Sequence, residues 1–388
     1  MNKVVISGLF LIVGISSTFV QVLIPSLKQQ YNLSYFQIGF FDAAFFISYG
    51  LFSFIFAIIA KRIKPTKMIN YGLILVIIAY LGWLICQITS PSNFYYLLVS
   101  QFLLSIGIVA IFTCCEYIAL FEKNIYSVKR LSKYESIHSI GAFLAPFLIS
   151  SLLTLSIFVN SQNIVFIMFF IVMIAFAYFI KITLKKSTEF KAPFYKDKSI
   201  NILFLTKHFK SAIFSFISLM IYVGIEITVA TYLVLLEKQT LQSSGLYLSL
   251  YWLLIFIGRL IGGKLLKNSK QVFTIVTVSL IGILLLIVGL LFSKLTIAML
   301  VLCGLTNSVL FPVIFSLGFY FNKQKNIELS GFMLTAISGG AFIPLITGII
   351  VDATNIYSSL IVCAVCYGIL VIINLYLNSN KSAKANYI

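Results

Sequence analysis

Twelve long apolar stretches divide this chain, and their length restricts what it can fold into more than any other feature. They occupy residues 4–26, 36–60, 68–89, 94–121, 134–157, 163–183, 211–236, 243–266, 271–293, 295–320, 328–351 and 355–377. Each has about 20 residues or more, the length that an α-helix needs to cross the hydrocarbon core of a bilayer. Because a backbone in lipid must satisfy its own hydrogen bonds, we predict an all-α membrane protein with twelve transmembrane helices.

The basic residues predict how these helices are oriented. Of the 28 Lys and Arg residues, 25 lie in the two terminal segments or in every second connection, and the remaining connections hold only Lys28, Lys238 and Lys294. Since Lys and Arg stay on the cytoplasmic side during insertion, we expect both termini in the cytoplasm. Two termini on one side require an even number of spans, in agreement with the twelve apolar stretches.

Composition excludes several classes of protein. Hydrophobic residues make up 61% of the chain and its mean hydropathy is +1.07, which is too apolar for a soluble domain of this size. The net charge of +18 follows the predicted cytoplasmic rim, so we expect anionic lipid headgroups as a partner and no nucleic acid. The first apolar stretch is predicted to be a retained helix, because it has no small-residue cleavage site. All six cysteines lie inside spans and the chain has two His, so we expect no cofactor, no metal site and no disulfide framework.

The longest polar segment, residues 184–210, predicts the domain organisation. It is a cytoplasmic linker by composition, with Pro193 and many lysines, and it separates a six-helix bundle at 1–183 from a second bundle at 211–388. The fifth and eleventh spans share a short pattern, SIGAFLAP ending at Pro146 and SGGAFIP ending at Pro344. Such a repeat resembles the twofold repeat of major facilitator transporters. The prolines are predicted to break their helices locally, which suits moving parts.

Four acidic residues inside the predicted spans carry most of the functional signal. Only ten acids occur in the chain; Asp42, Glu116, Glu135 and Glu226 lie within spans, and His138 joins them. An intramembrane charge costs at least about 2.5–3.5 kcal/mol, so it needs a partner, a water-filled cavity or a proton. We therefore predict these five residues as candidates for proton coupling.

Glu116, Glu135 and His138 are expected at one level in the cytoplasmic half. Glu135, His138 and Ser139 share one helix face by their spacing. They are predicted to bind a proton or the substrate. For Glu135 a second interpretation is open, in which it is an interfacial charge near a helix start that pairs with Lys133.

The remaining candidates stand in the second half and in the second span. Glu226 is the most deeply placed acid, and Tyr222 precedes it by one helical turn. Asp42 is a candidate whose alternative is snorkelling to water from the outer face. Arg259 is predicted to hold a cytoplasmic gate through a carboxylate or a helix end, and Trp252 is a cavity candidate.

Four segments of the second half carry a resemblance to one family. They are Tyr222-Val223-Gly224-x-Glu226, then Leu250-Tyr251-Trp252 with Ile257-Gly258-Arg259-x-Ile261-Gly262, then Gly304-x-x-Asn307-Ser308-x-x-Phe311-Pro312, and last Ser338 to Pro344 with Gly348 and Asp352. The chain resembles the fucose/glucose–galactose:proton symporter branch of the major facilitator superfamily. In the first half, Leu23-Ile24-Pro25 and Gln37-x-Gly39 fit more loosely. Acids and a His, at Glu116, Glu135 and His138, occupy positions where that branch carries amides, and Tyr117 occupies the position of a proline.

The resemblance implies a proton-coupled secondary transporter, not an enzyme, that imports a sugar or sugar-like solute by alternating access. Its expected setting is the inner (cytoplasmic) membrane of a bacterium, as a monomer. The substrate-binding candidates are Gln21, Glu116, Glu135, His138, Tyr222, Glu226, Trp252 and Asn307. The gating or structural candidates are Arg259, Pro146, Pro312, Pro344 and Asp352. The open alternative is a proton-driven exporter, or an importer of an organic acid, siderophore or drug-like metabolite.

Overall fold

The computed structural model describes residues 3–89, 93–121, 128–156, 162–186, 209–236, 241–265, 271–322 and 327–385. Within this part of the chain, twelve helical segments are long and apolar enough to cross a membrane, and each coincides with one predicted stretch. The α-helices are α1 (Lys3–Tyr31), α2 (Tyr35–Arg62), α3 (Pro65–Thr89), α4 (Tyr95–Phe121), α5 (Val128–Ser156), α6 (Gln162–Lys186), α8 (Phe209–Leu235), α9 (Leu241–Leu265), α10 (Gln271–Leu291), α11 (Thr296–Ser308), α12 (Leu310–Asn322), α13 (Ile327–Thr335), α14 (Gly339–Ala353) and α15 (Ser358–Ala385). The predicted fold class is thus confirmed.

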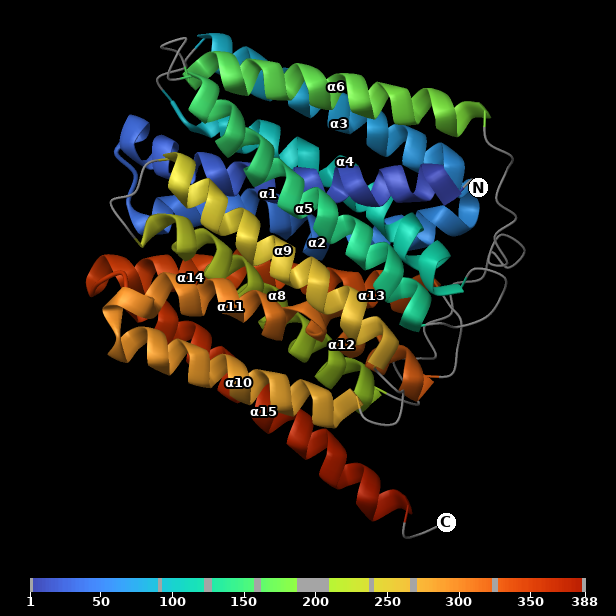
Figure 1. Ribbon diagram of the computed structural model, residues 1–388. Helices are drawn as coiled ribbons and strands as arrows, with labels where there is room; N and C mark the ends of the chain where they lie inside the picture. Colours follow the sequence, from blue (N-terminus) through green and yellow to red (C-terminus); the bar gives the residue numbers. More distant parts are fainter. Residues whose placement is uncertain are drawn as a thin grey trace.

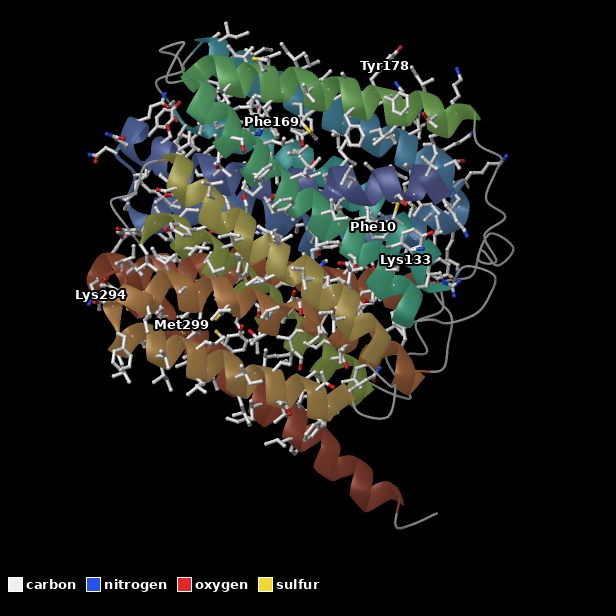
Figure 2. The ribbon with its side chains drawn as sticks, viewed as in Figure 1. Phe10, Lys133, Phe169, Tyr178, Lys294 and Met299 are labelled. Carbon is white, nitrogen blue, oxygen red and sulfur yellow. The ribbon has the colours of Figure 1, made fainter. Side chains whose placement is uncertain are left out.

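The helices lie side by side with their axes roughly aligned (Figure 1). Helix α1 begins and α15 ends at the same end of the molecule. Figure 2 places Lys133 at that end and Lys294 at the opposite end, which is the arrangement that the alternating basic connections predict. Which end faces the cytoplasm stays a prediction.

Glycines bring the helices of each half into direct backbone contact. A methyl group on Gly14 of α1 would lie 2.0 Å from the carbonyl oxygen of His138, and one on Gly141 of α5 would lie 2.3 Å from that of Leu11. In the second half, a methyl group on Gly339 would lie 1.8 Å from the carbonyl oxygen of Met220 on α8. Small residues allow such close crossings between membrane helices. The crossing of α1 and α5 fixes where the functional side chains of α5 point.

The tenth and eleventh spans are each interrupted. The positions of Pro146, Pro312 and Pro344 relative to helix interruptions differ. Span ten consists of α11 and α12, with Pro312 directly after the interruption at Val309. Span eleven consists of α13, a 3₁₀ turn at Ala336–Ser338 and α14, so its interruption precedes Pro344, which lies within α14. Pro146 lies inside the unbroken helix α5. The predicted local break is therefore absent at Pro146, and in span eleven the interruption precedes Pro344; no break was predicted at Pro312.

Hydrogen bonds from other helices explain why a proline is tolerated in α5. Proline has no N–H, so the carbonyl four residues earlier loses its helical partner. For Pro146 that carbonyl belongs to Ala142, and it accepts a hydrogen bond of 3.1 Å from Oγ1 of Thr18 on α1. For Pro312 it belongs to Ser308, and it accepts one of 3.4 Å from Nε of Arg259. Neighbouring helices thus satisfy the freed carbonyl groups, as membrane proteins require.

The two halves of the chain meet along two main seams. Helix α5 packs against α9, and α2 packs against both α13 and α14. Helix α1 runs past Pro25 to Tyr31, so the first span extends beyond its predicted end at residue 26. Most of the predicted linker, 184–210, lies outside the described residues, and the division into two bundles at that point stays a prediction. The seams place side chains of both halves around one buried site.

Candidate functional site

A buried ion pair between the two halves is the centre of the site. Nη1 of Arg259, on α9, lies 2.9 Å from Oε2 of Glu135, on α5, and the two side chains are 2% and 1% exposed. The same nitrogen donates to Oγ of Ser139 at 2.8 Å and to the carbonyl oxygen of Glu135 at 3.1 Å. Because Glu135 and Ser139 stand one turn apart on α5, one guanidinium nitrogen reaches both.

Glu226, on a third helix, α8, also lies close to the guanidinium group of Arg259. Its Oε1 lies 3.6 Å from Nη2 of Arg259 and accepts a hydrogen bond of 2.5 Å from the hydroxyl of Tyr222. Tyr222 and Glu226 are neighbours on one face of α8, as their spacing predicts. Helices α5, α8 and α9 therefore contribute one charged cluster, in which two carboxyl groups face a single Arg.

A chain of hydrogen bonds holds α8 in this position. The hydroxyl of Tyr251 donates to the carbonyl oxygen of Glu226 at 3.1 Å, and Nδ2 of Asn307 donates to the Tyr251 oxygen at 2.9 Å. The hydroxyl of Tyr367 donates to Oδ1 of Asn307 at 2.6 Å. Asn307, a substrate-binding candidate, thus supports the backbone of Glu226 and does not line the cavity described below. Tyr251 and Tyr367 were not among the predicted site residues, since aromatic residues are too frequent in this chain to single them out.

Glu116 on α4 lies beside Glu135 without a matching base. Its side chain is completely buried, and the carboxyl groups of the two residues are close enough to interact directly. Both carboxyl oxygens of Glu116 and Oε1 of Glu135 lack a hydrogen-bond partner among the described residues. Two adjacent carboxyl groups with unused oxygens form an arrangement that a shared proton would satisfy.

His138 completes the group expected in one half of the membrane. Its Nδ1 lies 3.5 Å from Nη1 of Arg259, and its side chain lines the same cavity as Glu135. The structure therefore brings Glu116, Glu135 and His138 together, as predicted. It also adds Glu226 to this group, which the sequence analysis had treated as a separate, deeper acid.

The interfacial interpretation of Glu135 does not fit this geometry. Glu135 is buried within α5, whereas Lys133 is exposed. The ion pair of Glu135 is formed with Arg259, and no ion pair with Lys133 occurs among the described residues. Arg259 does reach a carboxylate and a helix end, Ser308 at the end of α11, as predicted for a gating residue. It also lines the cavity, which was not expected.

The cluster lines a small cavity between the two halves. The cavity has a volume of about 50 Å³, enough for one or two water molecules. Polar groups and aromatic rings share its wall: Ser17, Phe45, Phe46, Tyr49, Phe112, Glu135, His138, Val223, Glu226, Ile227, Trp252, Arg259, Phe311 and Ile337. Known ligand pockets hold roughly 300–1,000 Å³, so in this conformation the cavity is too small for a typical ligand.

Two predicted residues lie away from this cavity. Asp42 on α2 is 4% exposed and accepts a hydrogen bond of 2.8 Å from Oγ1 of Thr231 on α8. It is therefore buried against the other half of the chain and does not snorkel to water. Gln21 on α1 is 1% exposed, and neither atom of its amide has a hydrogen-bond partner among the described residues. Neither residue lines the cavity.

Asp352 joins the two halves at the end that is predicted to face outward. Its two carboxyl oxygens accept hydrogen bonds of 2.9 Å each from the backbone N–H groups of Tyr35 and Phe36, the first two residues of α2. Ser34 and Gln37 form a capping box that satisfies the next N–H group of this helix. A residue of the second half therefore completes the N-terminal cap of α2, where the helix dipole favours a negative charge.

A second ion pair joins the same two segments at the opposite end. Nζ of Lys61, at the end of α2, lies 2.6 Å from Oε1 of Glu328, in the first turn of α13. The side chains are 6% and 0% exposed. Both residues lie at span ends or in connections by sequence, and the pair was not predicted, because the sequence of a helix end does not indicate whether a neighbouring helix covers it. Helix α2 is thus fastened to span eleven at both ends.

Twelve helices of membrane-spanning length surround a buried charged cluster and a cavity, an arrangement typical of a membrane transporter. A sequence model of the Major Facilitator Superfamily matches residues 6–325, and the chain belongs to this family. The glucose/galactose transporter of Brucella abortus biovar 1 (strain 9-941) is 25% identical over 379 residues, which cover 92% of this chain and 90% of that protein. The L-fucose-proton symporter of Escherichia coli (strain K12) is 23% identical over 401 residues, which cover 94% and 90% of the two chains.

Solved structures show the same fold. The crystal structure of the transporter FucP in the outward conformation matches with a TM-score of 0.73 at 20% identity, covering 96% of this chain and 97% of that one. The nucleoside transporter NupG matches with a TM-score of 0.69 at 14% identity, covering 96% and 99%. At this identity the likeness shows the fold alone. The resemblance inferred from the sequence is confirmed at the level of the family and of its sugar-transporting relatives.

Proposed function

We propose that this protein imports a sugar or a sugar-like solute together with protons, by alternating access between its two halves. The observation that carries the proposal is the cluster of Glu116, Glu135 and Glu226 beside the guanidinium group of Arg259; Glu135, Glu226 and Arg259 line the cavity. The relatives named as glucose/galactose transporter and L-fucose-proton symporter support the same substrate class.

The number of charges in the cluster supports proton coupling. With all three carboxyl groups ionised, the cluster would carry two uncompensated negative charges in a membrane interior, because Arg259 supplies one positive charge. Burying unpaired charge costs several kcal/mol per ion. A proton on Glu116, Glu135 or Glu226 removes that cost. The cluster therefore stores a proton when the cavity is closed and releases it when water enters from one side.

The wall of the cavity supports an uncharged, polar substrate. Trp252, Tyr49 and Phe311 supply flat apolar surfaces, while the carboxyl groups of Glu135 and Glu226 supply hydrogen-bond acceptors. Arg259 already faces both carboxyl groups, so an anionic solute would have to displace one of them. A sugar needs no such exchange. This difference favours a sugar over the alternative of an organic acid.

The fastening of α2 to span eleven supports alternating access. Asp352 closes this seam at one end, and the Lys61–Glu328 pair closes it at the other. Opening to either side requires that one of these contacts break while the other persists. The cavity of about 50 Å³ is too small for a sugar, so binding requires a conformation with a wider one.

The setting follows from the charge pattern and the relatives. We propose that the protein works as a monomer in the cytoplasmic membrane of a bacterium, with lipid around its helices. Both termini and the linker at 184–210 face the cytoplasm in this proposal. The bundles are then residues 1–183 and 211–388.

The test separates exchange from accumulation in proteoliposomes. Glucose, galactose and fucose are offered to the wild type, with and without an imposed pH gradient. In Glu226→Gln the side chain resembles the permanently protonated form, so counterflow exchange of the accepted sugar should persist while accumulation driven by the gradient is lost. Glu116→Gln and Glu135→Gln are tested in parallel, and at least one of the three must separate the two activities.

Asp42→Asn is tested beside them, because Asp42 is a buried acid and a candidate for proton coupling that lies outside the cavity. If the cluster carries the coupling, Asp42→Asn keeps accumulation driven by the gradient. If all three Glu variants accumulate sugar as the wild type does, coupling through this cluster is wrong. If none of the sugars exchanges in the wild type, the substrate assignment is wrong, and organic acids and siderophores become the solutes to test.

A further inference from the structure

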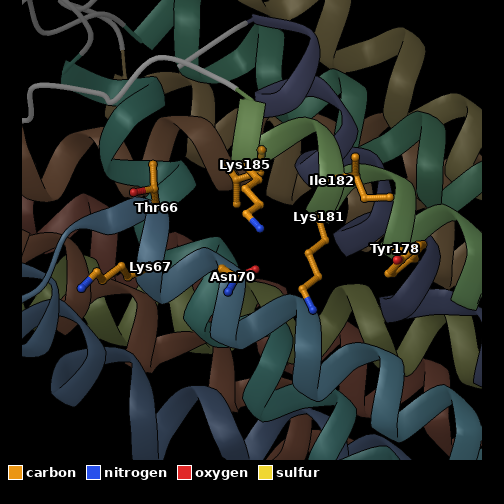
Figure 3. Close-up of a pocket in the computed structure, with 8 residues that line it drawn as sticks. Thr66, Lys67, Asn70, Tyr178, Lys181, Ile182 and Lys185 are labelled. Carbon is orange, nitrogen blue, oxygen red and sulfur yellow. The ribbon is translucent and has the colours of Figure 1, made fainter.

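A basic crevice on the membrane-facing side of the first half lies far from the central site. It has a volume of about 470 Å³ and is formed by the first turns of α3 and the last turns of α6. Figure 3 shows Thr66, Lys67 and Asn70 on α3 opposite Tyr178, Lys181 and Lys185 on α6. Three lysines and no acidic residue line it. The transport mechanism uses none of these side chains.

The lysines of the crevice are not used in ion pairs. Among the described residues, Lys67, Lys181 and Lys185 have no acidic partner within ion-pair distance. Lys181 and Lys185 are one turn apart on α6, so both extend over the same gap. Figure 3 shows Lys181 and Lys185 extending from α6 on one side of the gap, with Asn70 and Lys67 on α3 at the other side. The gap thus gathers positive charge that nothing in the described part of the chain neutralises.

The N-terminal end of α3 and two neutral hydrogen-bond donors, Thr66 and Asn70, also favour binding of an anion in the crevice. The crevice lies at the N-terminal end of α3, where the helix dipole favours negative charge. The lysines of α6 offset the opposite charge at the C-terminal end of that helix. Asn70 and the hydroxyl of Thr66 can donate hydrogen bonds to phosphate oxygens. These groups together suit a phosphate or a phosphodiester.

The surface next to the crevice is apolar and faces outward from the protein. On α6, Tyr178 and Ile182 line the crevice and are exposed, and Ile171 and Val172 continue the exposed stripe towards the opposite end of the helix. In a membrane-spanning helix, such a stripe contacts acyl chains. A ligand with an anionic head and hydrocarbon tails fits both surfaces at once. A soluble phosphate would use the crevice alone.

We propose that this crevice binds the headgroup of an anionic phospholipid from the leaflet on the side predicted to be cytoplasmic. The lysines of α6 hold the phosphate, and the exposed stripe of α6 contacts an acyl chain. Basic crevices between membrane helices are a known way of binding such headgroups. The proposal does not depend on which solute the protein transports.

Native mass spectrometry of the purified full-length protein tests this binding. The protein is titrated with phosphatidylglycerol and, separately, with phosphatidylcholine of the same acyl chains. The wild type should retain phosphatidylglycerol with about tenfold higher affinity. Lys181→Gln/Lys185→Gln should remove most of this preference, since a lysine near the membrane contributes roughly fivefold. Lys181→Arg/Lys185→Arg should keep it, because Arg also binds phosphate.

The matched control removes two lysines elsewhere. Lys133 and Lys294 are exposed and do not line the crevice, so Lys133→Gln/Lys294→Gln lowers the total charge equally and should retain the preference. The proposed site would be wrong if both Gln double variants lost the preference for phosphatidylglycerol equally, or if Lys181→Arg/Lys185→Arg lost it. Soluble glycerol phosphate serves as the second arm. If it displaces phosphatidylglycerol at equal concentration, the crevice binds a soluble anion, and the lipid assignment is wrong.

Discussion

Nη1 of Arg259 lies 2.9 Å from Oε2 of Glu135, and 124 positions in the sequence separate the two residues. This pair joins α9 of the second half to α5 of the first. Both side chains are buried, so neither charge has access to bulk water in this conformation. Removing one partner from a buried pair leaves an uncompensated charge, which costs about 3–5 kcal/mol.

Arg259→Gln is expected to lower the stability of the protein strongly, because Glu135 then remains buried without its base. Adding Glu135→Gln should recover part of the loss. Thermal unfolding in detergent measures the effect of each single variant and of the double variant. The double variant should be more stable than Arg259→Gln alone. Additive losses would show that the pair does not couple the two helices energetically.

The two contacts that fasten α2 are expected to act in opposite directions. Lys61→Gln breaks the pair with Glu328 and should open the seam on that side, whereas Asp352→Asn weakens the cap on α2 and should open the other side. The measurement uses a Ser17→Cys reporter in the cavity wall, in a background without the native cysteines. A membrane-impermeant thiol reagent is added to intact cells and to inverted vesicles.

Labelling of the reporter should rise in inverted vesicles for Lys61→Gln and in intact cells for Asp352→Asn. Lys133→Gln is the control, because this exposed lysine lies on the same side as Lys61 without fastening two helices. The same change in both variants, or a rise on the opposite sides, would contradict the assignment of these contacts to two separate gates.

Glu116 is expected to make stability dependent on pH. Ionising it would place a second negative charge beside Glu135 in a medium of low dielectric constant, whereas the unfolded chain ionises in water at no such cost. The wild type should therefore lose thermal stability from mildly acidic to mildly alkaline pH. Glu116→Gln should show a flatter profile. Identical profiles would mean that the group keeps one charge state across this range.

The orientation in the membrane is expected to follow the basic residues. A cysteine replacing Lys238 should react with an impermeant reagent in intact cells, and a cysteine replacing Lys196 should react only in inverted vesicles. The six native cysteines lie within predicted spans and are replaced beforehand. External labelling at position 196 would reverse or invalidate the predicted topology.

The membrane-spanning helices were predictable because a bilayer acts on each stretch of chain separately. About 20 apolar residues must form a helix there whatever the neighbouring helices do. The same local rule identified Glu116, Glu135 and Glu226 as functional candidates, because an ionised carboxyl group inside the membrane is energetically unfavourable. The contact between Tyr222 and Glu226 was also predictable, since residues four positions apart lie on the same face of a helix.

What only the tertiary structure decided is which distant side chains meet. Periodicity places Glu135 on a face of α5, but the crossing at Gly14 and Gly141 turns that face towards Arg259. Lys61 and Glu328 become a buried pair because α2 packs on α13, and Pro146 stays helical because Thr18 reaches the carbonyl of Ala142. Hydropathy acts within one segment, whereas these contacts depend on the fit of side chains between segments. The sequence by itself therefore determined the spans and the candidates, and packing determined the site.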